Sequence, residues 1–304
     1  MIGISLAYLP GKNIEEACRD FMNLQEEFSL QACEFHMECN QFDSAFYHAD
    51  EKVLEVVSKI RKQVKIMGVH LPYLDLNPIS HNPLIEQFAT EIYIKAINNA
   101  AVMKADYVVF HARGAEDAYD DRQEELGRWR DKAGELGDIA QAGSTAFCFE
   151  NADNVRIIKD MEKIICELPQ VGMCLDIGHL FERVKLANPW ERLAGRFVDR
   201  YLPFSSVIGK GMPYYEMADW KEFFEKNSSR IRCFHLHNHN GRNAHCPVTA
   251  GKINMESILH AISDFTSAPI IIEADYRQTG IGQLRKDLVF LKKVIEQGKT
   301  HSFK

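Results

Sequence analysis

Six short apolar runs decide the fold: VKIMGVH (64–70), DYVVFH (106–111), TAFCFE (145–150), VGMCLD (171–176), IRCFH (231–235) and APIIIE (268–273). Each run ends on a His, Asp or Glu. A strand that stops on such a residue presents one polar group at its C-terminal tip. These groups converge only if the strands are parallel and close around an axis, as in a (β/α)8 barrel, whose functional residues lie at the C-terminal face. The runs therefore predict a TIM barrel whose mouth carries metal-binding side chains.

The remaining sequence alternates strand-like and helix-like segments, which is typical of a parallel sheet built from βαβ units. Predicted strands are 2–6, 31–37, 64–70, 106–111, 145–150, 171–176, 231–237 and 269–275. Helical spacing of apolar residues marks 14–27, 50–63, 83–104, 121–142, 154–167, 254–265 and 282–297. Eight such repeats in 304 residues predict one barrel domain that spans 1–304.

The stretch from about 180 to 230 is longer than one crossover helix needs. It contains several aromatic residues, among them Trp190, Tyr214, Tyr215 and Trp220. Long insertions at the C-terminal side of a barrel often form a lid or a dimer surface, and the simpler alternative is a helix with a packed loop. We favour the lid or interface, so homo-oligomerisation stays open.

The composition is that of a globular enzyme, with 46% hydrophobic and 26% charged residues. A net charge of −7 argues against nucleic-acid binding through a broad basic surface. No apolar stretch approaches the length of a membrane span, and residues 2–9 lack the charged start of a signal peptide. We therefore expect a cytoplasmic protein with no membrane partner. Cys33, Cys148, Cys174 and Cys233 lie in apolar runs and are expected to be reduced core residues.

Four residues that end apolar runs, and one histidine that follows such a run, carry the chemistry. Glu150 and Glu273 end the fifth and eighth predicted strands, so they would face each other across the mouth, where they can flank a divalent ion or exchange protons with a substrate. Asp176 and His179 belong to a D-I-G-H motif and could point at the same site. His235 ends the apolar run IRCFH and is the firmest nitrogen ligand. Oxygen and nitrogen ligands together suit zinc, manganese, iron or cobalt without selecting among them.

Other histidines lie around this set. His70 opens H-L-P-Y and His111 opens H-A-R-G, and each is a candidate ligand to a second ion or hydrogen-bond donor to substrate. The alternative for either is a capping histidine at a strand end. Strand alternation places His237 on the same face as His235, while His245 must arrive by a loop.

We expect His237 and His239 to be solvated or to lie behind the ligands. Two arginines, Arg113 and Arg242, are candidates for binding a substrate oxygen or phosphate.

These motifs resemble the superfamily of xylose isomerase-like barrels, which includes endonuclease IV and many sugar or sugar-phosphate isomerases and epimerases. The resemblance runs from the third predicted strand to the eighth. It implies a shared metal set on Glu150, Asp176, His235 and Glu273. In the epimerase-like members the two glutamates also act as acid and base, on opposite faces of the carbon that loses and regains its proton.

The endonuclease branch has further ligands, and most of them have a counterpart here. By resemblance they fall on His70 with Tyr73 in the H-x-P-Y motif, on His111, on His179, and on Asn243 with His245. The branch has an Asp where Asn243 stands, and a neutral amide is a weaker ligand, which argues against a third ion. The second strand carries Glu34 in the manner of the isomerase-like members.

The resemblance favours a metal-dependent isomerase or epimerase of a small sugar or polyhydroxy carbonyl compound. One ion would bind two adjacent substrate oxygens and stabilise the enediolate left after proton abstraction. Glu150 and Glu273 would exchange the protons, His179 would hold a hydroxyl, and Tyr73 is a candidate substrate contact. The alternative is an endonuclease IV-like phosphodiesterase that cleaves abasic DNA with two or three ions. A third hypothesis is a barrel that binds metal without turnover.

Overall fold

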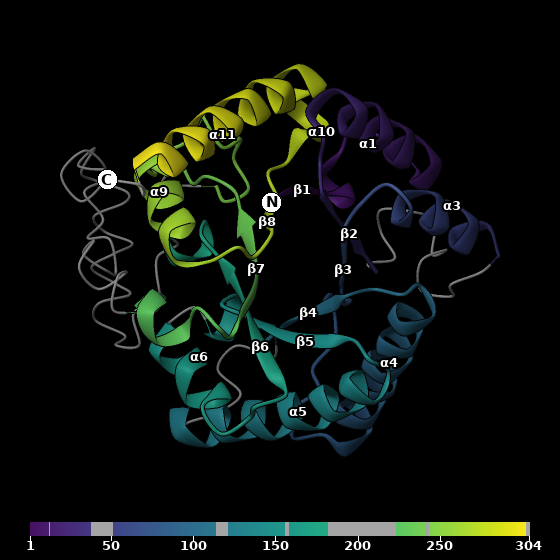
Figure 1. The fold of residues 1–304 in the computed structure, drawn as a ribbon. Coiled ribbons are helices and arrows are strands. Elements are labelled where there is room, and N and C mark those ends of the chain that lie inside the picture. The colour runs from purple at the N-terminus through teal and green to yellow at the C-terminus, as the bar shows by residue number, and fades with distance from the viewer. Residues whose placement is uncertain are drawn as a thin grey trace, which may run out of the picture.

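The computed structural model describes residues 1–11, 13–37, 51–113, 121–155, 158–181, 223–240 and 243–301. Its strands are all parallel, pair in chain order and close from β8 to β1. They are β1 (Ile2–Ser5), β2 (Ala32–His36), β3 (Ile66–His70), β4 (Tyr107–His111), β5 (Ala146–Glu150), β6 (Val171–Asp176), β7 (Ile231–Leu236) and β8 (Ile270–Ile272). Figure 1 shows the helices as a ring around these strands. The predicted (β/α)8 barrel is confirmed.

Seven of the described helices agree with the predicted helical segments to within a few residues, and the short helix α10 was not predicted. They are α1 (Ile14–Phe28), α3 (Glu51–Arg61), α4 (Pro83–Val102), α5 (Arg122–Ala142), α6 (Ile158–Ile165), α9 (Met255–Phe265), α10 (Tyr276–Thr279) and α11 (Ile281–His301), with 3-10 turns η1 (Leu6–Tyr8), η2 (Asp153–Val155) and η3 (His179–Phe181). Side chains cap several helices: Asn13, Asn82 and Asn254 each accept a hydrogen bond from a first-turn backbone N–H. These caps satisfy donors that have no partner within the helix.

Strand alternation divides the apolar side chains into two regions. Outward-facing residues such as Phe110, Phe149 and Phe234 pack beneath the helices in the main core. Inward-facing residues form a smaller cluster of Tyr107, Val109, Cys148, Cys174 and Cys233 inside the barrel. These cysteines are buried free thiols, as predicted. The next inward position on several of these strands is a strand-end His, Asp or Glu, so the polar site lies directly above this cluster.

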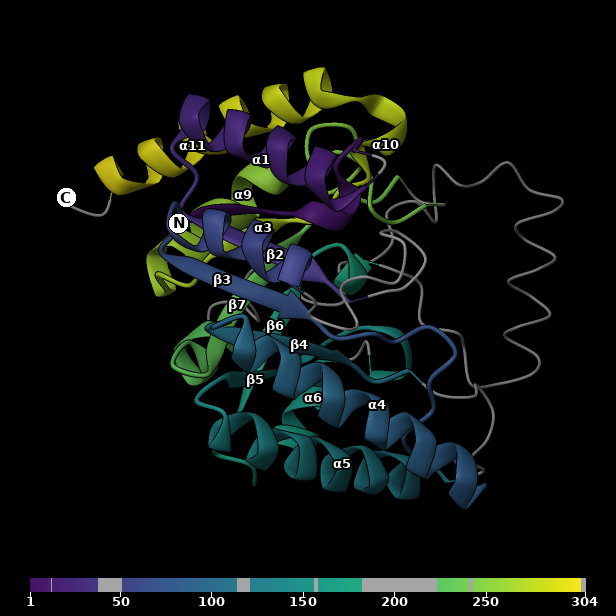
Figure 2. The ribbon, with the colours of Figure 1, turned by 90° about the vertical axis from the view of Figure 1, so that its right-hand side faces the viewer.

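The strand register brings the polar residues level with one another at the C-terminal mouth. His36 pairs with His70, His111 with Glu150, and Asp176 with His235. In Figure 2 the arrowhead of β3 marks this end of the barrel. The predicted eighth strand was too long, because β8 ends at Ile272 and leaves Glu273 just beyond it. The chain turns there because the Asp275 side chain caps α10 by accepting the N–H of Arg277.

The greater part of the long aromatic insertion lies outside the described residues, since 182–222 are not among them. The described helices include none that is both long and apolar enough to cross a membrane.

Candidate metal centre

The residues expected to share one ion lie together at the mouth. One ligand atom from each of Glu150, Asp176, His235 and Glu273 lies within 4.8 Å of all the others, and all four residues are buried. The Nδ1 atom of His235 is 3.4 Å from Glu150 Oε1 and 3.4 Å from Glu273 Oε2. Three carboxylates and one imidazole form a ligand set that suits a divalent ion of the first transition series or zinc.

Several atoms of this set have close neighbours but no hydrogen-bond partner among the described residues. They are both carboxylate oxygens of Glu150, Oδ2 of Asp176 and Nδ1 of His235. A buried polar atom without a partner is costly, and a buried charge more so. Three carboxylates gathered around one ring also repel one another unless a cation lies between them. The donor atoms therefore fit a bound divalent cation.

The electrostatics favour ionised carboxylates. Burial alone would raise the pKa of Glu150, but the neighbouring His111 and His235 outweigh it and hold that pKa well below its usual range. Burial is likewise outweighed by His235 at Glu273, whose pKa is lowered. Burial would lower the pKa of His235, yet Glu273, Glu34 and Glu150 raise it well above its usual value. A metal ion would therefore displace a proton from His235 when it binds.

His70 and His111 approach the other oxygen of Glu150. Their Nε2 atoms lie 3.4 and 2.9 Å from Glu150 Oε2. Nδ1 of His70 is 2.8 Å from the Leu71 carbonyl oxygen, and Nδ1 of His111 is 3.2 Å from an Asp153 carboxylate oxygen. As metal ligands both rings would be neutral, with the proton on Nδ1 beside these acceptors and the lone pair on Nε2 on the side of Glu150. The Glu150 carboxylate thus stands between two ligand groups and has the geometry to bridge two ions.

His179, His237 and His245 form a third group beside Asp176, with ligand atoms within 4.8 Å of one another. Nδ1 of His245 is 2.7 Å from the Glu273 carbonyl oxygen. Burial, together with His237, lowers the pKa of His245 to about 3, so its ring is neutral and keeps a lone pair on Nε2. His237 differs, because its Nδ1 accepts the backbone N–H of His245 at 2.9 Å. Nδ1 also lies 3.3 Å from the Asn238 carbonyl oxygen, and Nε2 of the same ring lies 3.1 Å from Asp176 Oδ1.

Asp176 is therefore held on one oxygen and available on the other. Its Oδ1 accepts the backbone N–H of His179 at 2.7 Å and faces Nε2 of His237. The Asn151 side chain fixes the backbone of Asp176. Asn151 Oδ1 accepts the Asp176 N–H at 2.7 Å, and Asn151 Nδ2 donates to the Asp176 carbonyl oxygen at 2.9 Å. A Cβ on Gly178 would lie 1.9 Å from the His237 ring. The glycine of D-I-G-H thus leaves room for His237.

The alternative of a solvated His237 is wrong. His237 is fully buried and lies behind the candidate ligand Asp176, whereas His239 is only half-buried. The position of His237 in the sequence was compatible with a solvated ring and with a ring that lies behind the ligands. The packing of the ring against Gly178 decides for the second.

Two predicted substrate contacts lie next to the ligand groups. The Tyr73 ring stacks on His111 with centroids 4.4 Å apart, and the guanidinium carbon of Arg113 is 5.2 Å from the Tyr73 centroid. Tyr8, which sequence reasoning missed, stacks on His245 with centroids 5.0 Å apart. Arg242 lies outside the described residues.

Sequence reasoning also missed His36 at the end of β2. Its Nε2 is 2.9 Å from Glu273 Oε1, and its ring stacks on His70 with centroids 4.3 Å apart. The signal was present in the segment ACEFHM, another apolar strand with a histidine at its tip. Glu34 lies on the same face as His36, two residues earlier, and reaches His235.

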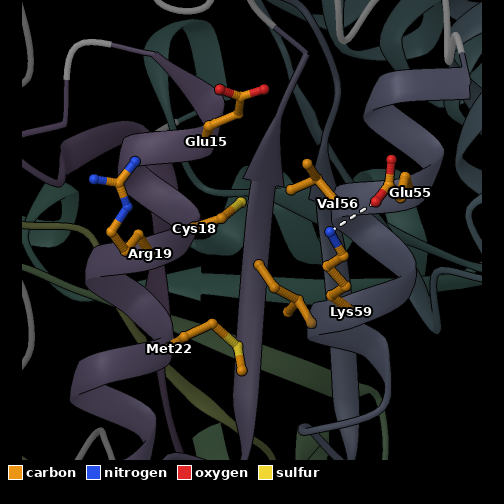
Figure 3. Close-up of a pocket in the computed structure, with 8 residues that line it drawn as sticks. Glu15, Cys18, Arg19, Met22, Glu55, Val56 and Lys59 are labelled. Carbon is orange, nitrogen blue, oxygen red and sulfur yellow. Dashed lines mark ion pairs between the residues drawn. The ribbon is translucent and has the colours of Figure 1, made fainter.

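A separate pocket of about 400 Å³ lies on the outside of the barrel between α1 and α3 (Figure 3). Its lining residues are Glu15, Cys18, Arg19, Met22, Glu55, Val56, Lys59 and Ile60. Glu55 and Lys59 form an exposed ion pair across one turn of α3 at 2.7 Å. The predicted ligands all lie elsewhere, so the barrel mouth is the candidate site.

Comparison with known proteins agrees with the architecture. A search of curated proteins found no match. A D-tagatose 3-epimerase-like protein has 20% identity and a TM-score of 0.71, covering 99% of each chain. An L-ribulose 3-epimerase has 11% identity and a TM-score of 0.69, covering 99% of this chain and 96% of its own. A protein from Thermus thermophilus, soaked with ZnCl2, has 16% identity and a TM-score of 0.62, covering 97% of each chain.

At these identities the three likenesses concern the fold. The family model described as xylose isomerase-like TIM barrel matches residues 26–294, which includes seven of the eight strands and every candidate ligand. The chain belongs to the family of xylose isomerase-like TIM barrels.

Proposed function

We propose that this protein is a divalent-metal-dependent isomerase or epimerase of a small sugar or related polyhydroxy carbonyl compound. The observation that carries the proposal is the convergence of Glu150 and Glu273 on one ligand set with Asp176 and His235. The two carboxylates can thus reach the same substrate carbon while they help to hold the ion. The similarity in fold to sugar 3-epimerases supports the same substrate class.

The chemistry divides between the ion and the two glutamates. When bound, the divalent ion would supply a Lewis acid for two adjacent substrate oxygens. One glutamate would remove the proton from the carbon beside the carbonyl, and the other would return a proton on the opposite face. The lowered pKa values keep both carboxylates ionised in the empty site, so either could accept the proton from carbon. The glutamate that returns a proton would have to take one up when substrate binds. His36 holds Oε1 of Glu273 at 2.9 Å, which fixes the orientation of that side chain.

Other side chains would position the substrate. Nε2 of His179 lies 4.0 Å from Glu150 Oε1, close enough to bind a hydroxyl of a substrate held at the ligand set. Tyr73 and Arg113 extend the site beyond His111 and would contact the part of the substrate that does not react. The ion is zinc, manganese, iron or cobalt in this proposal, since all four accept mixed oxygen and nitrogen ligands.

The group of His70, His111 and Glu150 favours a second candidate function. With Glu150 between two ligand groups, two ions could lie side by side, which is the arrangement of many phosphodiesterases. This alternative is an endonuclease IV-like enzyme that cleaves abasic DNA. His237 weighs against a third ion, because its Nδ1 accepts the His245 backbone N–H at 2.9 Å and its Nε2 faces Asp176 Oδ1 at 3.1 Å.

One experiment separates the two functions. Protein loaded with Mn²⁺ or Co²⁺ is incubated in D2O with a panel of ketopentoses and ketohexoses, and NMR follows deuterium at the carbons beside the carbonyl. The same preparation is incubated with duplex DNA that contains an abasic site. We expect deuterium exchange with at least one sugar and no enzymatic nicking. Nicking without exchange on any sugar would refute the isomerase proposal in favour of the phosphodiesterase.

A further inference from the structure

Glu34 is a fully buried carboxylate beneath the ligand set, and the reaction proposed above does not use it. The Tyr107 hydroxyl donates to its Oε2 at 2.9 Å. Nε2 of His235 lies 3.1 Å from the same oxygen, and Nε2 of His36 lies 3.6 Å from Oε1. A buried carboxylate is stable only when donors or positive charge surround it. Glu34 is thus tied to two histidines that in turn reach the glutamates of the site.

The contact with Glu34 determines which nitrogen of His235 faces the ion. An ionised carboxylate only accepts hydrogen bonds, so Nε2 of His235 must carry a proton. The neutral ring then has its lone pair on Nδ1. That atom lies 3.4 Å from both Glu150 and Glu273 and has no hydrogen-bond partner among the described residues. Glu34 therefore turns the lone pair of His235 toward the ligand set.

Tyr107 holds Glu34 in place, and Gly68 makes room for Tyr107. The Tyr107 ring is buried inside the barrel and lies over Gly68 of the neighbouring strand β3. A Cβ on Gly68 would lie 2.2 Å from Cζ of Tyr107. A glycine within a strand often marks such a close approach. The position of the phenol, and through it that of Glu34, depends on this glycine.

We propose that Glu34 is a positioning residue that fixes His235 as an Nδ1 ligand and strengthens the affinity of the centre for its ion. A carboxylate behind a ligating histidine sets the tautomer, orients the ring and raises its basicity. The inference rests on the metal centre proposed above but not on the identity of the substrate. Glu34 faces the inside of the barrel from β2, one layer of side chains below the mouth.

The test is a Co²⁺ titration followed by calorimetry and by the visible absorption of the bound ion. Glu34→Gln keeps the size of the side chain and one acceptor oxygen but removes the charge. We expect it to bind Co²⁺ about 10- to 100-fold more weakly than the parent protein and to shift the absorption bands. Tyr107→Phe should weaken binding in the same direction by a smaller factor, because Glu34 stays charged but loses one donor.

Asp287→Asn is the matched control. Asp287 is also a fully buried carboxylate, and it accepts hydrogen bonds from the Val248 N–H at 2.7 Å and the Tyr276 hydroxyl at 2.6 Å. None of these three residues belongs to the ligand set. We expect Asp287→Asn to lower the melting temperature while its affinity for Co²⁺ stays that of the parent.

Two results would overturn the inference: Co²⁺ affinity of Glu34→Gln within about threefold of the parent, or an equal loss of affinity in Asp287→Asn. The proposals fail separately. A parent protein that binds no Co²⁺ refutes the metal centre itself. A parent that binds Co²⁺ but exchanges no sugar proton refutes the isomerase proposal and leaves the role of Glu34 standing.

Discussion

Replacing Gly178 with alanine should damage the metal centre through His237. The added Cβ would lie 1.9 Å from Cε1 and 2.1 Å from Nδ1 of that ring. Carbon atoms in contact keep about 3.5 Å apart, so the ring must move by about 1.5 Å. His245 stacks on the ring with centroids 4.0 Å apart, which leaves little room for that movement. The shift would break the contact of His237 Nε2 with Asp176 Oδ1, now 3.1 Å long.

Two energetic terms add to the expected loss. Overpacking a buried site costs about 1–3 kcal/mol. Moving the ring would also break the hydrogen bond from the His245 backbone N–H to His237 Nδ1, and such a bond contributes about 0.5–1.5 kcal/mol. Because the ring can relax in part, we expect the free energy of unfolding to fall by roughly 3 kcal/mol. The affinity for Co²⁺ should fall about tenfold, since Asp176 Oδ1 loses its contact with the His237 ring.

Chemical denaturation measures the free energy of unfolding, and calorimetric titration measures the affinity for Co²⁺. Gly127→Ala is the control, because a Cβ there meets nothing within 4 Å, and alanine should stabilise α5 by up to about 1 kcal/mol. Adding Gly178→Ala to His237→Ala should cost little further stability, since the clashing ring is gone. An unchanged stability and Co²⁺ affinity in Gly178→Ala, or a full additional loss in the double variant, would refute this reasoning.

Three further predictions concern the ligands and the ion. Glu150→Gln and Glu273→Gln should each lower turnover at least about 100-fold with the fold retained, because both side chains face the mouth; turnover within a few-fold of the parent would contradict the assignment. Exhaustive chelation, checked by elemental analysis, should abolish turnover. It should also lower the free energy of unfolding by about 2.7 kcal/mol if the free ion was present at 100 times its Kd. Activity that survives chelation would refute metal dependence. Asn243→Asp should raise occupancy of a third ion beside His179 and His245 in elemental analysis, because a carboxylate offsets the charge of a divalent ion; equal metal content in both proteins would count against this idea.

The sequence predicted the fold because strand ends are visible in it. A run such as TAFCFE places Glu150 at a strand tip, and parallel pairing then brings it level with His111 on the neighbouring strand. The same logic predicted that Asp176 and His235 would lie at the same mouth, and in the structure they are paired across neighbouring strands. These inferences need only the period of the strand and the direction of the sheet.

The structure adds contacts that no spacing rule gives. His237 was ambiguous because its burial depends on the space above Gly178, and the two residues follow two different strands, β7 and β6. Asn151 and Tyr8 act through a backbone clamp and a ring contact, and neither has a sequence pattern of its own. Glu34 lies one layer below the strand tips, so attention to tips alone passes over it.

The central claim is that Glu150, Asp176, His235 and Glu273 hold a divalent ion. Anomalous diffraction at the manganese edge, from crystals of protein whose Mn²⁺ content is known from elemental analysis, tests it most directly. The account predicts a strong peak among these four side chains, with Nδ1 of His235 as the nitrogen ligand about 2.0–2.3 Å away. A loaded protein with no peak at this place, or an ion bound to His235 through Nε2, would contradict it.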